Sequence, residues 1–258
     1  MERLLIVGDM HVGKKQAIMP DEVCIDTEEL KRTISASPLQ KRIFGKWEEM
    51  VDEVGKVDAV LTMGDICDGF NYRSHGTGLW TSDINLQVTV ATELLSMIKT
   101  NKYLGVQGSF YHVGDNMSSD RSVVDHFGGV FGDELSINIS KSRIHASHFV
   151  GVSSSGTAYR TTPIAREMML AKINSDDYGD FDLILRGHAH YYVQAAFTRS
   201  KGVICPCWCG RDEFVARQTL AFNPHLGYVL VNVDGNDLSI DPHVFTLKNK
   251  ELIKEVVV

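Results

Sequence analysis

The sequence predicts an α/β fold in which two packed β-sheets are flanked by helices. Short apolar runs at residues 3–7, 58–62 and 103–107 have the length and composition of buried strands. The segments 39–53 and 82–100 lie between these runs and carry apolar residues at helical spacing. The last third of the chain is richer in strand-like runs. Strand–helix–strand units followed by a strand-rich half favour two packed sheets with helices outside.

The expected helices are defined by their apolar spacing. The first carries Ile43, Phe44, Trp47, Met50 and Val51, and the second carries Leu86, Val90, Leu94, Leu95 and Ile98. A helix is also expected over 163–173, because proline is favoured at the first helical position. A shorter helix is expected over 123–130.

The remaining strands are expected in the second half of the chain. They are 136–139 and 143–149 as a hairpin that turns at Lys141-Ser142, a buried strand at 181–185, and the runs 227–233 and 238–245 with Asp234-Gly235 as a turn. No repeat, low-complexity segment or Pro/Gly/Ser-rich linker divides the sequence, so residues 1–258 are expected to form a single domain.

The charge balance restricts the classes of partner. The net charge is −7 and the pI is about 5.8, which argues against extended nonspecific binding to nucleic acid. A small phosphate ester, a nucleotide or a nucleic-acid end remains compatible, and an acidic protein is suited to collecting divalent cations. No segment approaches a membrane span in length. The odd number of cysteines, without a signal peptide, indicates reduced thiols and a cytoplasmic protein. The oligomeric state stays open.

Metal-binding side chains follow four of the expected strands. They are Asp9 and His11 after the first strand, Asp65 after the second, His148 near the end of 143–149, and His188 and His190 after 181–185. The carboxyl ends of strands in α/β sheets are where several loops converge. Two carboxylates and four imidazoles suit a divalent metal site that does not require thiolates.

The spacing within each motif supports a shared site. Alternate residues of an extended segment point the same way, so Asp9 and His11 can reach one ion, as can His188 and His190. Glycines before Asp65 and His188 permit tight turns where a Cβ atom would crowd the site. Two divalent ions about 3.7 Å apart repel by about 18 kcal/mol at an effective dielectric of 20. Asp65 is therefore the candidate bridging ligand.

Taken in order, these motifs resemble the calcineurin-like metallophosphoesterase superfamily. The matching segments are Gly8-Asp9-Met10-His11, Gly64-Asp65, a glycine loop with His112, the later His148, and Gly187-His188-Ala189-His190. The resemblance implies a four-layer αββα sandwich with two mixed sheets between helices. It also implies that Asp9, His11 and His190 bind a first metal, that Asp65 bridges, and that His148 and His188 bind a second.

The third loop departs from the family pattern of Gly-Asn-His followed by an acid. Ser109 stands at the asparagine position and His112 comes two residues late, as in a phage- and prophage-encoded subset with Gly-Ser/Thr-x-x-His-Val-Gly. The segments Pro206-Cys207-Trp208 and Leu226-Gly227 resemble the same subset. The second metal therefore has Ser109, Asn116 or His112 as candidate replacement ligands.

The resemblance implies a hydrolase for phosphate esters. Two divalent metals, with manganese first and iron, zinc or nickel as alternatives, would activate a hydroxide for attack on phosphorus. Asp65 would act in catalysis as the bridge, and His112 would protonate the leaving oxygen. A phosphodiester is favoured over a monoester, with a nucleotide or nucleic acid as the candidate substrate. The alternative is a noncatalytic metal-binding scaffold on the same fold, which the altered third loop would suit.

Several residues keep two interpretations. His145 is an alternative ligand to His148, since strand alternation lets only one face the site. Cys205, Cys207 and Cys209 suggest zinc, although a buried apolar face is at least as compatible with their spacing. Aromatic and arginine side chains can stack a nucleobase or pack onto the core; they are Phe70, Tyr72, Arg73, Trp80 and Tyr111. Tyr111 and Arg160 are the candidate substrate-binding residues.

Overall fold

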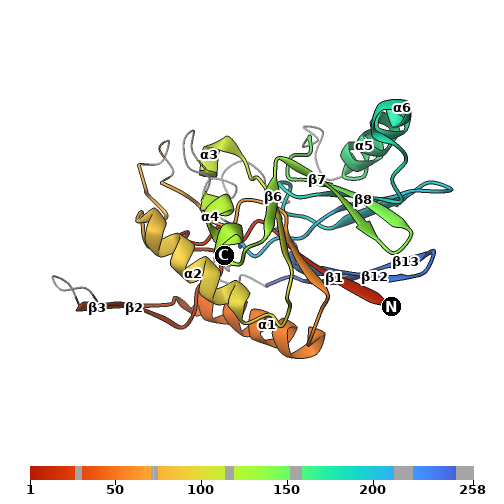
Figure 1. The fold of residues 1–258 in the computed structure, drawn as a ribbon. Coiled ribbons are helices and arrows are strands. Elements are labelled where there is room, and N and C mark those ends of the chain that lie inside the picture. Colours follow the sequence, from red (N-terminus) through yellow and green to blue (C-terminus); the bar gives the residue numbers. More distant parts are fainter. Residues whose placement is uncertain are drawn as a thin grey trace, which may run out of the picture.

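The computed structural model describes residues 1–26, 31–70, 72, 75–113, 119–151, 159–211 and 223–247. Its core consists of two mixed β-sheets that lie between helices (Figure 1). The first sheet has the strand order β13-β12-β1-β4-β5-β6, and the second has the order β10-β11-β9-β8-β7. The first contains β1 (Glu2–Val7), β4 (Ala59–Thr62), β5 (Tyr103–Val106), β6 (Val130–Gly132), β12 (Leu226–Asp234) and β13 (Asp237–Phe245). The second contains β7 (Glu134–Ile139), β8 (Ser142–Ser147), β9 (Leu183–Arg186), β10 (Val193–Ala196) and β11 (Lys201–Ile204).

Side-chain alternation along β1 shows how the layers pack. Leu4 and Ile6 point into a cluster that joins the two sheets, whereas Leu5 and Val7 point into a cluster with the helices on the other face. The helices on that face are α1 (Pro38–Val54), α2 (Ile84–Ser96) and α4 (Ser119–His126). On the far side, α5 (Thr162–Ile173) packs against the outer face of the second sheet, where Ile184 meets Ile164 and Met168. The predicted four-layer αββα sandwich is therefore confirmed.

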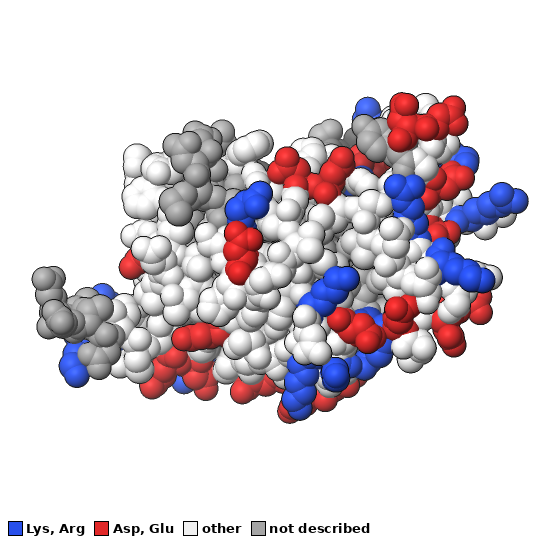
Figure 2. Space-filling model, viewed as in Figure 1, with Lys and Arg blue, Asp and Glu red and all other residues white. Residues whose placement is uncertain are grey.

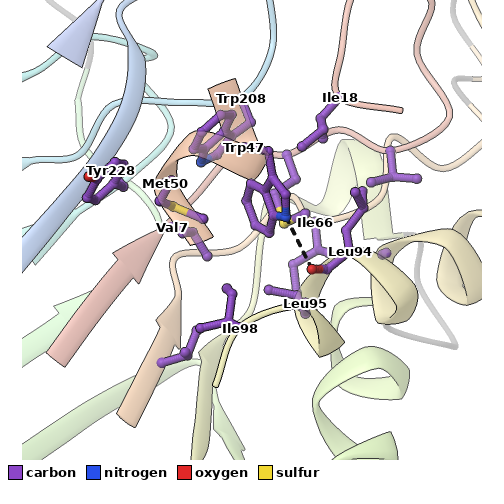
Figure 3. Packing of buried hydrophobic residues seen from close by; sticks show 14 of the residues in the cluster. Val7, Ile18, Trp47, Met50, Ile66, Leu94, Leu95, Ile98, Trp208 and Tyr228 are labelled. Carbon is purple, nitrogen blue, oxygen red and sulfur yellow. Dashed lines mark hydrogen bonds between the residues drawn. The ribbon is translucent and has the colours of Figure 1, made fainter. Parts of the chain in front are cut away.

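The first helix begins and packs as its sequence predicts. Ser37 and Gln40 form a reciprocal capping box at its start. Trp47 is fully buried and donates its indole N–H to the carbonyl of Leu94 at 3.2 Å (Figure 3). Its ring lies edge-on to Trp208 at 4.9 Å. The hydrogen bond ties α1 to α2, and the ring contact ties α1 to the segment that follows β11.

Several element bounds differ from the predictions. The β7–β8 hairpin turns at Ser140 and Lys141, because Ile139 pairs with Ser142. The β12–β13 hairpin turns at Gly235 and Asn236, because Asp234 pairs with Asp237. The helix predicted over 123–130 begins earlier, at Ser119, and ends at His126. Elements for which the sequence predicted no bounds are the hairpin β2 (Glu22–Asp26) and β3 (Lys31–Ser35), the strands β6, β10 and β11, and the short helices α3 (Phe110–Val113) and α6 (Ser175–Tyr178). Within the described residues, no helix has the length and apolar character needed to cross a bilayer.

Candidate metal centre

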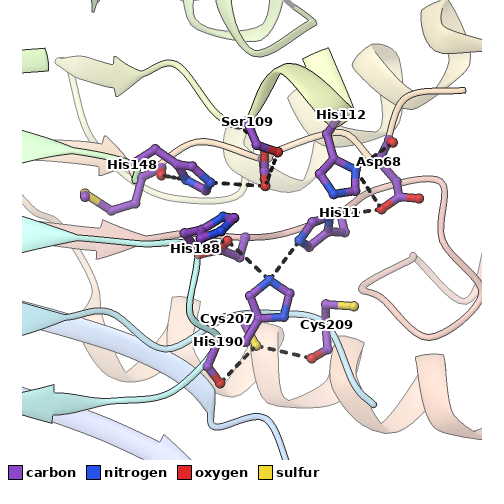
Figure 4. A network of polar contacts seen from close by, with 12 residues as sticks. His11, Asp68, Ser109, His112, His148, His188, His190, Cys207 and Cys209 are labelled. Atoms are coloured by element: carbon purple, nitrogen blue, oxygen red, sulfur yellow. Dashed lines mark hydrogen bonds and ion pairs between the residues drawn. The ribbon is translucent and has the colours of Figure 1, made fainter. Parts of the chain in front are cut away.

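The candidate site forms where parallel strands of both sheets end. In the first sheet, β1, β4 and β5 are parallel and deliver the loops that contain Asp9, Asp65 and His112. In the second sheet, β8 and β9 are parallel and deliver His148 and His188. The predicted metal-binding side chains therefore lie at a common edge, where two sheets rather than one supply them (Figure 4).

One group of ligand atoms contains Asp9, His11 and His190, all within 4.8 Å of one another. The Nε2 atoms of His11 and His190 are 3.0 Å apart, and His190 Nε2 is 3.3 Å from Asp9 Oδ1. Asp9 and His11 are buried and His190 is partly buried. These are the three residues that the resemblance to the metallophosphoesterase superfamily assigns to a first metal.

A second group contains Asp65, His148 and His188, again within 4.8 Å of one another. His148 Nδ1 donates to the carbonyl oxygen of Met63 at 2.6 Å, which turns Nε2 toward Asp65 Oδ2 at 3.1 Å. Among the described residues, no partner makes a well-directed hydrogen bond with this buried Nε2. A buried ring nitrogen held in this way fits a metal ligand whose other nitrogen is fixed by the backbone. The resemblance to the metallophosphoesterase superfamily assigns His148 and His188 to a second metal and Asp65 to the bridge between the two metals.

A third group links the other two through His11, Asp65 and His112. His112 Nδ1 lies 2.9 Å from the carbonyl oxygen of Asp68 and 3.3 Å from its carboxylate. The same carboxylate lies 3.0 Å from His11 Nδ1. Asp68 therefore orients two imidazoles at once and leaves their Nε2 atoms facing the group.

Backbone strain is concentrated at this site. Among the described non-glycine residues, positive φ angles occur at seven positions, and five of these are predicted ligands: Asp9, His11, Asp65, His188 and His190, with φ between 47° and 69°. The left-handed conformation costs of order 1–3 kcal/mol for a residue with a side chain. The fold compensates with hydrogen bonds between the loops, such as His11 N to Asp65 O at 2.9 Å. Five of these seven strained positions are candidate ligands, and such a concentration of strain is typical of a functional site.

Gly64 has the role that the sequence predicts. Its φ angle is +85°, and a Cβ atom there would lie 2.7 Å from Gly108 Cα and 2.8 Å from His148 Nδ1. At Gly187 the same construction gives 3.0 Å to Met63 O and 3.1 Å to Asp9 Oδ2. Glycine at these positions allows the loops to approach closely enough for the side chains to share one centre.

Ser109, which the sequence resemblance aligns with an asparagine, contacts Asp65. Its backbone N–H donates to Asp65 Oδ1 at 2.7 Å, and its hydroxyl lies 3.2 Å from Oδ1 and 3.1 Å from Oδ2. The contact fixes the orientation of the Asp65 carboxylate. Asn116, the other candidate replacement, lies outside the described residues.

The buried residues of the site shift the pKa values of one another. Burial lowers the pKa of His11 well below its ordinary value and also lowers that of His188, so both rings are neutral, as metal binding requires. Burial is the largest single influence on His148 and lowers its pKa, but the charge and hydrogen bond of Asp65, with smaller contributions from Asp9 and the Met63 carbonyl, together bring the pKa to about 10. Conversely, burial is the largest single influence on Asp65 and raises its pKa, but the charge and hydrogen bond of His148, with smaller contributions from His112 and the Ser109 N–H, together lower it below the usual range. Asp65 and His148 thus form a buried ion pair.

Two functional positions were not predicted from the sequence. Asp68 lies three residues after Asp65, and that short acidic spacing was the signal that could have identified it. Asp120 is fully buried and accepts the backbone N–H groups of Ile66 at 2.9 Å and Gly108 at 3.0 Å. It therefore joins the loop after β4 to the loop after β5. No local pattern marks Asp120, because its partners are distant in sequence.

His145 lies away from the candidate ligands. Its Nε2 is 3.1 Å from Glu134 Oε2 and its Nδ1 is 3.0 Å from Arg186 Nη1. Arg186 also donates to Glu167 of α5 at 2.8 Å and 3.1 Å. This network joins β7, β8, β9 and α5 beneath the site. The structure thus brings His148, and not His145, to Asp65.

The three cysteines do not share one face. Cys205 packs between the two sheets, whereas Cys207 belongs to the cluster on the helical side. Cys209 is also buried. Among the described residues, no group of potential metal ligands includes a cysteine. The geometry favours the apolar interpretation over zinc.

The two candidate substrate-binding residues contact different partners: Tyr111 packs on a histidine of the candidate site, and Arg160 packs on Tyr191. Tyr111 packs edge-on against His112 at 4.9 Å and is 40% exposed. The guanidinium of Arg160 lies 5.2 Å from the ring of Tyr191 and lowers the pKa of nearby His225, after the larger effect of burial. Trp80 packs against the core, whereas Phe70 and Tyr72 are exposed and 4.9 Å apart. Arg73 lies outside the described residues.

Comparisons with solved structures identify the fold. Vps29 from Chaetomium thermophilum superimposes with a TM-score of 0.50 at 11% identity, covering 95% of this chain and 99% of that one. Vps29 from Entamoeba histolytica, complexed with Zn²⁺, gives 0.49 at 13% identity over 95% and 98%. An archaeal phosphodiesterase gives 0.48 at 13% identity over 93% and 99%. No family model and no curated protein matches the sequence. At these identities, the first superposition shows a shared fold.

Proposed function

We propose that the chain is a two-metal phosphodiesterase of the calcineurin-like metallophosphoesterase superfamily, close to its phage-encoded subset. The supporting observation is that all six predicted ligands lie in two adjoining groups, each with one carboxylate and two imidazoles. Oxygen and nitrogen donors of this kind suit manganese first, with iron, zinc or nickel as alternatives. Asp9, His11 and His190 would hold one cation, and Asp65, His148 and His188 the other.

Bound cations would supply the Lewis acidity that activates water and neutralises charge on the phosphate. The protein supplies the remaining chemistry. Met63 and Asp68 hold His148 and His11 with their Nε2 atoms toward the centre. His112 is held at Nδ1, which donates to the carbonyl of Asp68, and in its imidazolium form it would donate the Nε2 proton to the leaving oxygen and return to the neutral ring.

Hydrolysis of two small esters tests this proposal. Turnover of bis-p-nitrophenyl phosphate and of p-nitrophenyl phosphate is measured with Mn²⁺ for the wild type, Asp65→Ala and His126→Ala. His126 is exposed on α4 and outside the candidate ligand groups, so its variant controls for the loss of a histidine. The proposal expects turnover in the wild type and in His126→Ala, a loss of at least about 100-fold in Asp65→Ala, and a preference for the diester.

The alternative function is a noncatalytic metal-binding scaffold. The observation that favours it is Ser109 at the asparagine position, because a hydroxyl is a weaker metal ligand than the family's amide oxygen. A wild-type protein that retains metal but hydrolyses neither ester above the Asp65→Ala background would support the scaffold. A preference for the monoester would contradict the diesterase assignment but leave the metal centre intact.

A further inference from the structure

Exposed aromatic side chains stand directly beside the imidazoles of the metal centre. Phe149 follows His148 in sequence, is 64% exposed, and its ring lies 4.9 Å from that of His188 at a tilt of 38°. Tyr111 is 40% exposed and lies 4.9 Å from His112. An exposed phenylalanine gains nothing from the hydrophobic effect unless something covers it. Each of these rings therefore presents exposed surface beside the centre.

The two aromatic side chains approach the centre from different sheets. Phe149 and its neighbour His188 follow β8 and β9 of the second sheet, whereas Tyr111 and His112 lie in α3 after β5 of the first. Figure 4 shows His188 beside His148 and His112 beside Asp68, on different sides of the cluster. Both belong to ligand groups that contain Asp65. A phosphate held at Asp65 would thus have an aromatic ring toward each end.

The α3 side offers more than one aromatic surface. Phe110, next to Tyr111, is 75% exposed. The chain at Gly69 approaches α3 so closely that a Cβ atom there would lie 2.1 Å from His112 O. Phe70 follows Gly69 directly and is 40% exposed. Exposed rings therefore lie on two segments whose backbones approach each other at Gly69 and His112.

We propose that the substrate is a phosphodiester between two nucleosides with unpaired bases, one base stacking on Phe149 and the other on Tyr111. This inference rests on the proposed phosphodiesterase function. Base–aromatic stacking tolerates any base and needs no hydrogen-bond readout. Duplex bases already stack on one another and cannot occupy both surfaces.

The charge distribution favours a short substrate over a long polymer. On the face shown in Figure 2, Lys and Arg lie among Asp and Glu, and no basic track runs across this face. The net charge of −7 also disfavours the binding of a long nucleic acid. Stacking and the bound cations, rather than a basic groove, would then supply the affinity.

The test compares thymidylyl-(3′→5′)-thymidine with an abasic analogue that has the same sugar–phosphate linkage. Hydrolysis with Mn²⁺ is followed by phosphorus NMR for the wild type, Phe149→Ala, Phe149→Trp, Tyr111→Ala and Phe197→Ala. Phe197 is 50% exposed and follows β10, so its variant is the matched control for an exposed ring. We expect the wild type to prefer the dinucleotide in kcat/KM by about tenfold or more. The ratio of kcat/KM for the dinucleotide to kcat/KM for the abasic analogue should fall toward one in Phe149→Ala and in Tyr111→Ala. The ratio should stay at the wild-type value in Phe149→Trp and in Phe197→Ala.

A binding measurement separates this inference from the proposed activity. A 2-aminopurine dinucleotide with a hydrolysis-resistant methylphosphonate linkage should lose fluorescence on titration with the wild type, and less so with Phe149→Ala. If bis-p-nitrophenyl phosphate is hydrolysed but neither base preference nor quenching occurs, the stacking inference is overturned and the phosphodiesterase stands. If quenching requires Phe149 and no ester is hydrolysed, the base-binding surfaces are supported and the catalytic proposal fails.

Discussion

Asp120 offers a quantitative test of how the site is held together. Its carboxylate accepts two buried backbone N–H groups, from Ile66 at 2.9 Å and from Gly108 at 3.0 Å. Replacement by alanine leaves both donors without an acceptor, and each buried unsatisfied donor costs about 1–3 kcal/mol. The predicted loss in the free energy of unfolding for Asp120→Ala is therefore about 2–6 kcal/mol. Because these bonds join the loops that carry Asp65 and Ser109, metal affinity should fall as well.

Urea unfolding of the metal-free protein measures this effect. Asp120→Asn keeps one acceptor oxygen, so its loss should be about half that of the alanine variant. Asp125→Ala removes an exposed carboxylate from the same helix and should change stability by no more than about 0.5 kcal/mol. An alanine variant that unfolds at the wild-type midpoint would refute the assignment of Asp120 as the tie between the two loops.

The pH dependence of the same variants provides a second check. Burial, reinforced by the negative charge of Asp65, raises the pKa of Asp120 from 3.8 to about 7. The folded state therefore holds this proton more tightly than the unfolded chain, and its stability falls as pH rises from about 4 to 7. The asparagine variant lacks this titration, so its stability deficit relative to the wild type should narrow over that range. A deficit that widens with rising pH would contradict the sign of the shift.

Three further predictions follow from the centre itself. The pKa of His148 is raised to about 10, so its stabilising charge is present below 6.5 and is lost as pH rises toward 10. Binding of a divalent cation at pH 8 should accordingly release about one proton, seen in calorimetry as a dependence on buffer ionisation enthalpy, and heats identical in all buffers would contradict it. Gly64→Ala should lose about 2 kcal/mol or more and weaken metal binding, because φ is +85° and the new Cβ would lie 2.7 Å from Gly108 Cα. As a control, Gly45→Ala lies in the open middle of α1 and should raise the free energy of unfolding by about 0.5–1 kcal/mol. Equal changes in the free energy of unfolding for the two variants, measured with urea, would refute the steric explanation. Asp68→Asn should lower metal affinity about 10- to 100-fold, since Asp68 orients His11, and unchanged affinity in a metal titration would refute that role.

The parts of the fold predicted from sequence are those governed by local periodicity. Ile43, Trp47 and Met50 mark one face of a helix, and all three are buried in α1. The ends of β1 and β4 were similarly visible as apolar runs that stop at Gly8 and Gly64. The order of the two sheets could not be read in this way, because it depends on pairing between distant strands.

The same distinction applies to the site. The proposed ligands were identified because each follows a strand, and the carboxyl ends of parallel strands meet. Asp120 carries no such signal, since its role depends on Ile66 and Gly108, which reach it only in the folded chain. No sequence pattern indicates that Phe149 is exposed either, because an aromatic residue after a strand is more often part of a core. Its exposure and its contact with His188 are tertiary properties.

Crystals of the full chain grown with Mn²⁺, with anomalous scattering collected at the manganese edge, test the central claim most directly. The account predicts two anomalous peaks per chain, one among Asp9, His11 and His190 and the other among Asp65, His148 and His188. Occupied manganese sites elsewhere, with no peak among these six side chains, would contradict it.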